Sequence, residues 1–289
     1  MTEQGAVKGP GPRSFGSIIV EMFRQYLGNI LPLTLIAAIV SVPLVAAGVM
    51  AFGPEFMTGV AGVAPDGSPM ASDRQLWAML VYVLLYMLGF LALSGAVATY
   101  VAGSLAGRPM SIGQAYSASL RRLPSMLGAS FFAGLVAGLP LSLAVVLAGS
   151  TGSFAGYFLL ALVLFIAVYL LLRLMFALFV ALLEQQPTIG AIVRSWGLVS
   201  GALQRTFGLL LAIGLLVGLI QFGLQSIGTP LPGLDALLVS VIVAPLTVVG
   251  DLLIYLDLRA RKETFGAEHL AAELDALDAV PQNPSKSMV

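Results

Sequence analysis

Six long stretches of the chain are apolar, and the charged residues lie almost entirely between them. The stretches cover roughly residues 29–52, 76–104, 125–149, 154–183, 207–227 and 234–257. Each reaches the length of about 20 residues at which a helix crosses the hydrocarbon core of a bilayer. Pro32 and Pro43 interrupt the first stretch, but a membrane helix tolerates proline because neighbouring groups satisfy the freed carbonyls. The pattern predicts an all-α, polytopic bundle of six transmembrane helices.

A second pattern, with the period of an amphipathic helix, begins at Ser14, Ser111 and Thr188. The three segments read SFGSIIVEMFRQY, SIGQAYSASLRRL and TIGAIVRSWGLVS. Their apolar residues recur three and four positions apart, which places them on one face of a helix. The first Ser or Thr of each segment suits an N-cap, because its side-chain oxygen accepts from a free amide. We therefore predict three interfacial amphipathic helices on the cytoplasmic side, each leading into a span.

These segments divide the chain into units 14–110, 111–187 and 188–263, each with two spans. An even number of spans per unit gives all three the same orientation, as in a parallel three-fold repeat. The alternative is that there is no repeat. Any interfacial helix has this pattern of apolar residues, and short matches that contain glycine recur by chance in a chain with 32 glycines.

A fourth start at Thr264 reads TFGAEHLAAEL, and Leu270, Leu274 and Leu277 form a narrower stripe there. We expect residues 264–289 to form an acidic cytoplasmic helix and a disordered tail. The organisation predicted is a disordered cytoplasmic N-terminus over 1–13, one membrane domain over 14–263, and this tail.

The distribution of Lys and Arg predicts the orientation. In the six-span arrangement twelve of the 14 lie on the side of the two termini, Arg173 lies within a span, and Arg74 alone lies on the other side. Because basic residues concentrate in cytoplasmic loops, both termini are predicted in the cytoplasm. The alternative is a miscount of two spans at the short turn 149–154.

Composition agrees with a membrane protein and excludes several kinds of chemistry. Hydrophobic residues make up 58%, charged residues 10%, and the net charge is zero, which favours no nucleic acid or other strongly charged partner. There is no cysteine, and the one histidine is His269. No metal-ligand cluster or nucleophile motif is present, so the sequence predicts no catalytic residue, no metal and no cofactor.

Two charged residues fall inside apolar stretches, where charge is costly unless paired or hydrated. Arg173 lies 15 residues before Thr188, and Asp251 lies 13 residues before Thr264. Counted back from the start of the next segment, the two residues lie at nearly the same depth in the membrane, because a helix rises 1.5 Å per residue. Two interpretations follow: a structural ion pair between the two spans, or part of a polar transport pathway.

The interfacial segments also supply candidate contacts to lipid. Arginines beside an apolar face favour anionic lipids of the cytoplasmic leaflet, and tryptophan favours the interface. The candidates are Arg24, Arg121, Arg122, Arg194, Arg205 and Trp196.

Three segments, SFGSIIVEMFRQY, IVRSWGLVSGALQRTFGLLL and LIYLDLRARKETFG, resemble a bacterial six-span family over about residues 14–266. It is the family of the membrane domain of glycerophosphoryl diester phosphodiesterase, with related polytopic proteins of unknown function. The resemblance implies that catalysis, where present, belongs to an attached soluble domain. We expect no such domain here, because the chain ends about 25 residues after the last motif.

These observations predict a non-enzymatic integral inner-membrane protein that acts as an envelope or lipid-associated scaffold or as an accessory subunit. Its expected partners are the lipid bilayer, including anionic lipids, and a membrane protein or a second copy of the chain. The alternative is a small transporter or channel with a path near Arg173 and Asp251.

Overall fold

The computed structural model describes residues 12–53, 73–226 and 234–278, and every regular element in these ranges is a helix. Six helical segments among them are long and apolar enough to cross a membrane, which confirms a multi-pass membrane protein. The elements are α1 (Phe15–Gly28), α2 (Ile30–Phe52), α3 (Asp73–Leu105), α4 (Ile112–Thr151), α5 (Phe154–Leu174), α6 (Ala177–Leu183), α7 (Thr188–Val199), α8 (Leu203–Ser226), α9 (Leu234–Leu238), a π-helix (Val239–Val243), α10 (Ala244–Lys262) and α11 (Ala267–Asp278).

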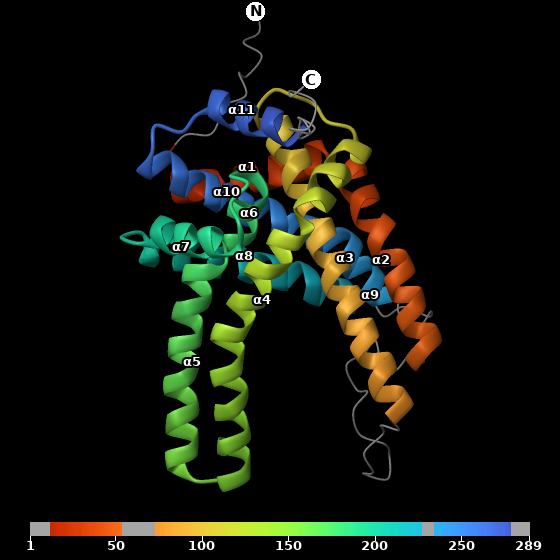
Figure 1. Cartoon of the computed structure of the whole chain (residues 1–289), viewed down its shortest axis with the longest axis vertical. Helices are drawn as coiled ribbons and strands as arrows, with labels where there is room; N and C mark the ends of the chain where they lie inside the picture. Colours follow the sequence, from red (N-terminus) through yellow and green to blue (C-terminus); the bar gives the residue numbers. More distant parts are fainter. Residues whose placement is uncertain (1–11, 54–72, 227–233, 279–289) are drawn as a thin grey trace, which may run out of the picture.

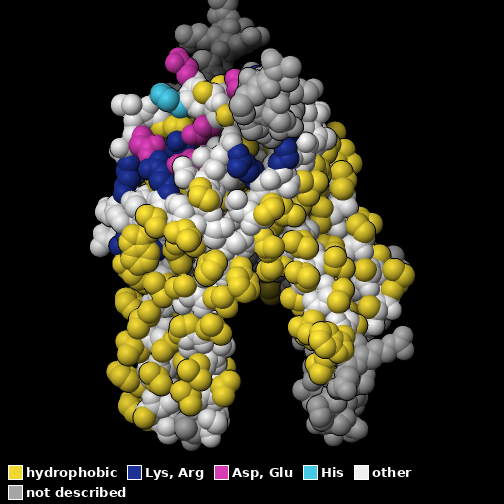
Figure 2. All heavy atoms as spheres, in the orientation of Figure 1, with side chains coloured by type: hydrophobic (Ala, Val, Ile, Leu, Met, Phe, Trp, Pro, Cys, Tyr) yellow, Lys and Arg dark blue, Asp and Glu magenta, His cyan; other side chains and the backbone are white. Residues whose placement is uncertain are grey.

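The long helices are arranged as hairpins that meet at one end of the molecule. The α2/α3 and α4/α5 hairpins point the same way and diverge, while α8 and the continuous α9, π-helix and α10 form a third pair (Figure 1). Figure 2 shows the opening between the first two hairpins and the hydrophobic side chains that cover them. Lys, Arg, Asp and Glu side chains gather where α1, α6, α7 and α11 lie. We call this part of the molecule the charged end.

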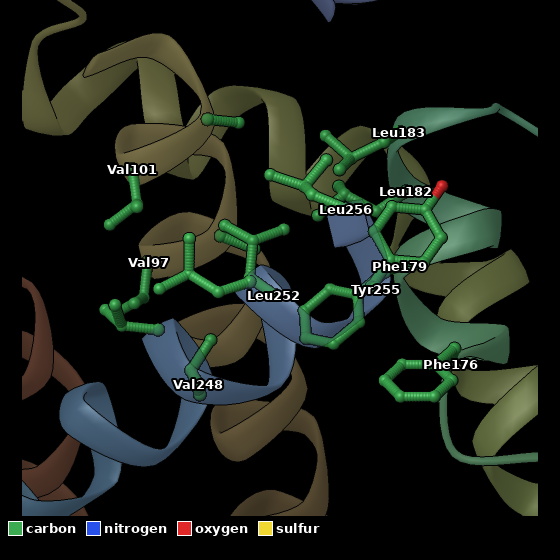
Figure 3. Close-up of a cluster of buried hydrophobic side chains, with 14 of the residues drawn as sticks. Val97, Val101, Phe176, Phe179, Leu182, Leu183, Val248, Leu252, Tyr255 and Leu256 are labelled. Carbon is green, nitrogen blue, oxygen red and sulfur yellow. The ribbon is translucent and has the colours of Figure 1, made fainter. Parts of the chain in front are cut away.

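Helix α10 is the centre of the packed core. In the last span, half of the 18-residue apolar stretch is buried inside the protein, compared with 17–22% of the corresponding stretch in the other five spans. The remaining spans therefore expose most of their surface to lipid, whereas α10 is enclosed by protein. Around it pack side chains from α3, from α6 and from the turn that precedes α6 (Figure 3). Those labelled in Figure 3 are Val97, Val101, Phe176, Phe179, Leu182, Leu183, Val248, Leu252, Tyr255 and Leu256.

Two of the three predicted N-caps are present in the structure, and the third is not. Ser14 accepts a hydrogen bond from the Ser17 amide at 3.3 Å, and Ser111 forms a capping box with Gln114. Thr188 is not an N-cap, because Pro187 precedes the first turn and Thr188 is itself helical. Its side chain is instead directed at α4, where a Cβ added to Gly128 would clash with it.

The structure also divides two predicted segments differently. The second interfacial helix and its span are one helix of 40 residues, α4, which contains Pro124 and Pro140 without ending at either. The expected fourth span 154–183 is present with these bounds, but a turn at residues 175–176 divides it into α5 and the short, almost fully buried helix α6.

The α3/α4 contact depends on a glycine. A Cβ at Gly95 would lie 2.9 Å from Met126 Cε and closer still to the hydroxyl of Ser119. That hydroxyl is buried and donates to the carbonyl of Ala92 at 3.0 Å. Small residues at such positions let membrane helices approach closely and form interhelical hydrogen bonds.

We predict that Gly95→Ala lowers the stability of the protein in detergent by about 1–3 kcal/mol, the usual cost of overpacking a tight contact. The thermal midpoint, followed by static light scattering or tryptophan fluorescence, measures the effect. Gly138→Ala on α4 is the matched control, because nothing lies within 4 Å of an added Cβ there. Equal midpoints for the two variants would contradict the close approach.

Candidate functional site

Arg173, in the last turn of α5, is held by neutral groups. Its guanidinium carbon lies 5.1 Å from the ring centre of Tyr169 and 4.8 Å from that of Trp196, and Nη2 donates to the Tyr169 hydroxyl at 2.9 Å. Nη1 donates to the Trp196 carbonyl and to the Ser200 hydroxyl. Nε is buried without a partner, and no carboxylate of the described residues forms an ion pair with Arg173. The positive charge is thus surrounded by aromatic rings and by hydroxyl and carbonyl oxygens, and it has no counterion among the residues that the structure describes.

Local sequence explains this arrangement. Tyr169 precedes Arg173 by four residues, so both lie on one face of α5. Helix α7 is fixed against this face, because Ser195 Oγ donates to the Arg173 carbonyl at 2.8 Å. A second cation, Lys262, donates to the carbonyls of Gly197 and Ser200 at the end of α7. It lies close enough to Arg173 for the two charges to interact, so the local potential is positive.

An apolar cavity of about 500 Å³ lies beside this cation, between α5 and α8. Val168 and Leu172 of α5 and Phe207 of α8 line it, and Tyr169 belongs both to the cavity wall and to the Arg173 cluster. Carbon atoms make up nearly all of the wall. The volume lies within the range of about 300–1,000 Å³ that is usual for binding pockets. The arrangement places the Arg173 guanidinium next to an apolar cavity.

The structure does not bring Arg173 and Asp251 together in the predicted ion pair. Within the described ranges, Arg173 bonds only to residues of α5 and the end of α7, and no ion pair connects it to Asp251. Helix α5 packs against α4, α7 and α8, whereas Asp251 belongs to the enclosed helix α10. The two residues share a distance from the repeat boundary, but α5 and α10 each pack against α7 and α8 and have no comparable contact with one another.

Asp257, near the end of α10, organises the charged end. Only 2% of it is exposed, and its carboxylate accepts from Arg205 at 3.0 Å and from Arg261 at 2.9 Å. It also accepts from the backbone amide of Arg13 at 2.7 Å. The carbonyl of Arg13 in turn accepts from both arginines, at 2.7 and 2.6 Å. Asp257 thus fastens the segment before α1 to α8 and α10.

A second buried charge, Arg259, joins three further elements. It pairs with Glu273 of α11 at 2.8 Å and lies 3.7 Å from Glu184, which follows α6. Its guanidinium carbon also lies 3.8 Å from the ring centre of Phe265. One oxygen of Glu184 accepts from the Tyr255 hydroxyl at 2.8 Å, and the other pairs with Arg194. Both carboxylate oxygens of Glu184 are therefore engaged.

Burial and pairing shift the ionisation of two groups in this network. Burial raises the pKa of Glu273 above its usual value, and the hydrogen bond from Arg259 offsets this only in part. Burial alone would lower the pKa of Arg194, but hydrogen bonds to Glu263 and Glu184 reverse this and raise it. Arg194 therefore stays charged at every physiological pH.

The other predicted interfacial residues separate into two groups. Arg194 and Arg205 are engaged by carboxylates, and Arg122 donates to the side-chain oxygen of Gln185. Arg24 and Arg121 are exposed, and Arg24 pairs with Glu21 of its own helix.

Sequence reasoning missed Asp257 and Arg259, because it ended the last span at residue 257 and placed the following residues in a solvated loop. A signal was present in DLRARKE. Asp257 and Arg261, like Arg259 and Glu263, are four residues apart, the spacing of ion pairs along one helix. Such spacing indicates that the helix continues beyond the apolar stretch.

We predict that Asp257→Ala destabilises the protein by about 3–5 kcal/mol, because it leaves Arg205 and Arg261 without their buried counterion. It should also release the backbone of Arg13, so trypsin should cleave after Arg13 faster than in the wild type. Mass spectrometry of a limited digest measures this cleavage. Asp275→Ala is the control, since its pairing with Arg108 at the charged end is solvent-exposed. Unchanged cleavage in Asp257→Ala would overturn the role assigned to this carboxylate.

Residues 151–256, from the end of α4 to within α10, match the family described as "Membrane domain of glycerophosphoryl diester phosphodiesterase". Searches of curated proteins and of solved structures gave no match. The matched segment contains Arg173, Arg205 and Tyr255, together with both helices that form the apolar cavity. The resemblance inferred from the sequence is confirmed: this part of the chain is similar to the membrane domain of that family.

Proposed function

We propose that this protein is a lipid-associated scaffold of the bacterial inner membrane that has no enzymatic activity of its own. The observation that carries the proposal is the Arg173 cluster with its adjoining apolar cavity. A guanidinium with only neutral partners, at the end of a membrane helix, suits the phosphate of a lipid. The carbon-lined cavity between α5 and α8 suits one of its acyl chains.

The proposed ligand is an anionic phospholipid of the cytoplasmic leaflet. Arg173 and Lys262 both lie at the charged end, and basic residues on that side favour a cytoplasmic location. Anionic lipids give this leaflet a negative surface potential, worth about 1 kcal/mol per nearby Lys or Arg. In this orientation both chain termini are cytoplasmic.

The proposed architecture is a parallel three-fold repeat in which α1, the first part of α4 and α7 are interfacial helices. The order of elements supports it, since each of these segments leads directly into a hairpin. In α1, Ile18 and Met22 are buried while Val20 and Leu27 are exposed. Apolar residues exposed on a helix at the charged end are in position to enter the headgroup boundary.

The diverging hairpins support the role of a scaffold. The α2/α3 and α4/α5 hairpins expose large apolar side chains along most of their lengths, Phe131 and Phe165 among them. Surfaces of this kind accept lipid, another membrane protein or a second copy of the chain. An accessory subunit would use them in the same way.

A transport path through Arg173 and Asp251 has less support. The cavity beside Arg173 is lined by carbon, and Asp251 does not belong to its lining. A path for a polar substrate needs polar groups along its length. We therefore give preference to the scaffold.

We predict that Arg173→Gln weakens binding of phosphatidylglycerol about tenfold or more, because a charge-assisted hydrogen bond to the phosphate is lost. Native mass spectrometry of the protein in mild detergent, with equal amounts of phosphatidylglycerol and phosphatidylcholine added, measures lipid retained per chain. Leu172→Trp, which fills the cavity, should lower retention of both lipids.

Arg108→Gln is the matched control, because this arginine is also at the charged end but pairs with Asp275. It should retain phosphatidylglycerol like the wild type. Equal loss of lipid in Arg108→Gln and Arg173→Gln would mean that general surface charge, and not this site, selects the lipid.

A further inference from the structure

A second cavity, of about 380 Å³, lies between the α2/α3 hairpin and the third helix pair. Its wall contains Ser41 of α2, Gln221 and Gln225 of α8, Asp235 of α9 and Ser240 of the π-helix. Ser41 is the middle residue of α2, about 17 Å along the axis from either end of this 23-residue helix. The cavity therefore extends from the end of the helices opposite the charged end to about the middle of the span.

Four of the polar side chains of this wall have no hydrogen-bond or ion-pair partner within the described residues. Ser41 is only 5% exposed, yet its hydroxyl, like the side chains of Gln221, Gln225 and Asp235, forms no hydrogen bond or ion pair there. Buried polar groups are normally satisfied, since an unmade hydrogen bond costs about 1–3 kcal/mol. Ser41 is such a buried group, whereas Gln221 and Asp235 are half-buried and Gln225 is exposed. Together these four side chains, from three helices, line one cavity. This is the arrangement of a binding site and not of a packing contact.

The π-helix at the wall supports the same conclusion. Short π segments inside membrane and soluble helices occur frequently at functional sites. Here Val239–Val243 form the segment, and the carbonyl of Ile242 accepts from the Tyr26 hydroxyl at 2.9 Å. Ser240 Oγ donates to the Leu237 carbonyl at 3.0 Å, so only its lone pairs remain available to a ligand. Ser240, which belongs to the π-helix and lines the cavity, thus offers a hydroxyl acceptor there.

The charge of the wall identifies the kind of ligand. Asp235 is the one ionisable carboxylate that lines the cavity, and no Lys or Arg lines it. A phosphate or carboxylate would face this aspartate without a counterion. An ammonium group instead supplies three N–H donors to the carboxylate, amide and hydroxyl oxygens that the wall offers. Apart from the hydroxyl of Tyr86, the remaining wall is apolar, with Leu44 and Phe90, and suits a short hydrocarbon chain.

We propose that this cavity binds a primary ammonium group carried on a short apolar chain. Asp235 provides the opposite charge, and Ser41, Ser240 and the two glutamines accept or orient the remaining hydrogen bonds. The ligand is either a soluble alkylamine or the amino headgroup of a membrane lipid whose phosphate stays outside the cavity. This site is separate from the Arg173 site and has the opposite charge.

The test uses the full chain in phosphatidylcholine nanodiscs, where the lipid has no N–H donor. Saturable binding of tritiated n-octylamine, measured by scintillation proximity, is expected for the wild type. Asp235→Asn should weaken it about tenfold or more, and Ser41→Ala severalfold. Glu268→Gln is the control, because this carboxylate is exposed on α11 at the charged end. Should Asp235→Asn fail to assemble, Gln221→Leu provides the same test.

Competition distinguishes the alternatives. Unlabelled octylamine should displace the probe, whereas octanol, which has the chain but no ammonium group, should not. Displacement by octanol as well as by octylamine, or wild-type binding in Asp235→Asn, would overturn the proposal. Replacing part of the phosphatidylcholine by phosphatidylethanolamine identifies the source. Weaker octylamine binding then indicates a lipid headgroup, and unchanged binding indicates a soluble amine.

Discussion

The compensation of two buried charges on α10 is the constraint on which the rest of the structure depends. Asp257 and Arg259 lie near the end of the most enclosed span and are 2% and 6% exposed. A buried charge is tolerated only with partners, and removing one partner typically costs about 3–5 kcal/mol. The partners come from the segment before α1, from α8, from the residue after α6 and from α11. Two residues therefore fix the positions of elements that are far apart in sequence.

Because of this constraint, the structure is tightly packed at the charged end and open at the opposite end. The ion pairs and the aromatic contacts of Tyr255 concentrate at the charged end, where Phe176 and Phe179 also pack. Away from it the hairpins diverge (Figure 1). Lipid is as apolar as the side chains there, so no hydrophobic force closes the hairpins on one another. The charged end can thus be rigid while the apolar arms leave room for ligands between them.

The sequence predicted the elements that depend on a one-dimensional signal. Apolar length identified six spans, and local hydrogen bonding identified the caps at Ser14 and Ser111. The pairing of Arg173 with Asp251 was predicted from depth alone, and depth gives the axial position of a residue but not the neighbours of its helix. Thr188 illustrates the same limit, since its cap was displaced by Pro187 and by its contact with α4. The two cavities could not be predicted, because each is formed by helices brought together only by the tertiary fold.

At the two cavities, charges of opposite sign that have no ion-pair partner among the described residues lie at opposite ends of the span. Arg173 lies at the charged end beside Lys262, and Asp235 lies in the first turn of α9, on the far side. The chain as a whole has no net charge. The separation of charge therefore arises from where Arg173 and Asp235 lie in the fold. With the charged end in the cytoplasm, the positive site faces the anionic leaflet and the negative site faces away from it. Arg173 therefore favours this orientation, and the distribution of the remaining Lys and Arg residues acts in the same direction.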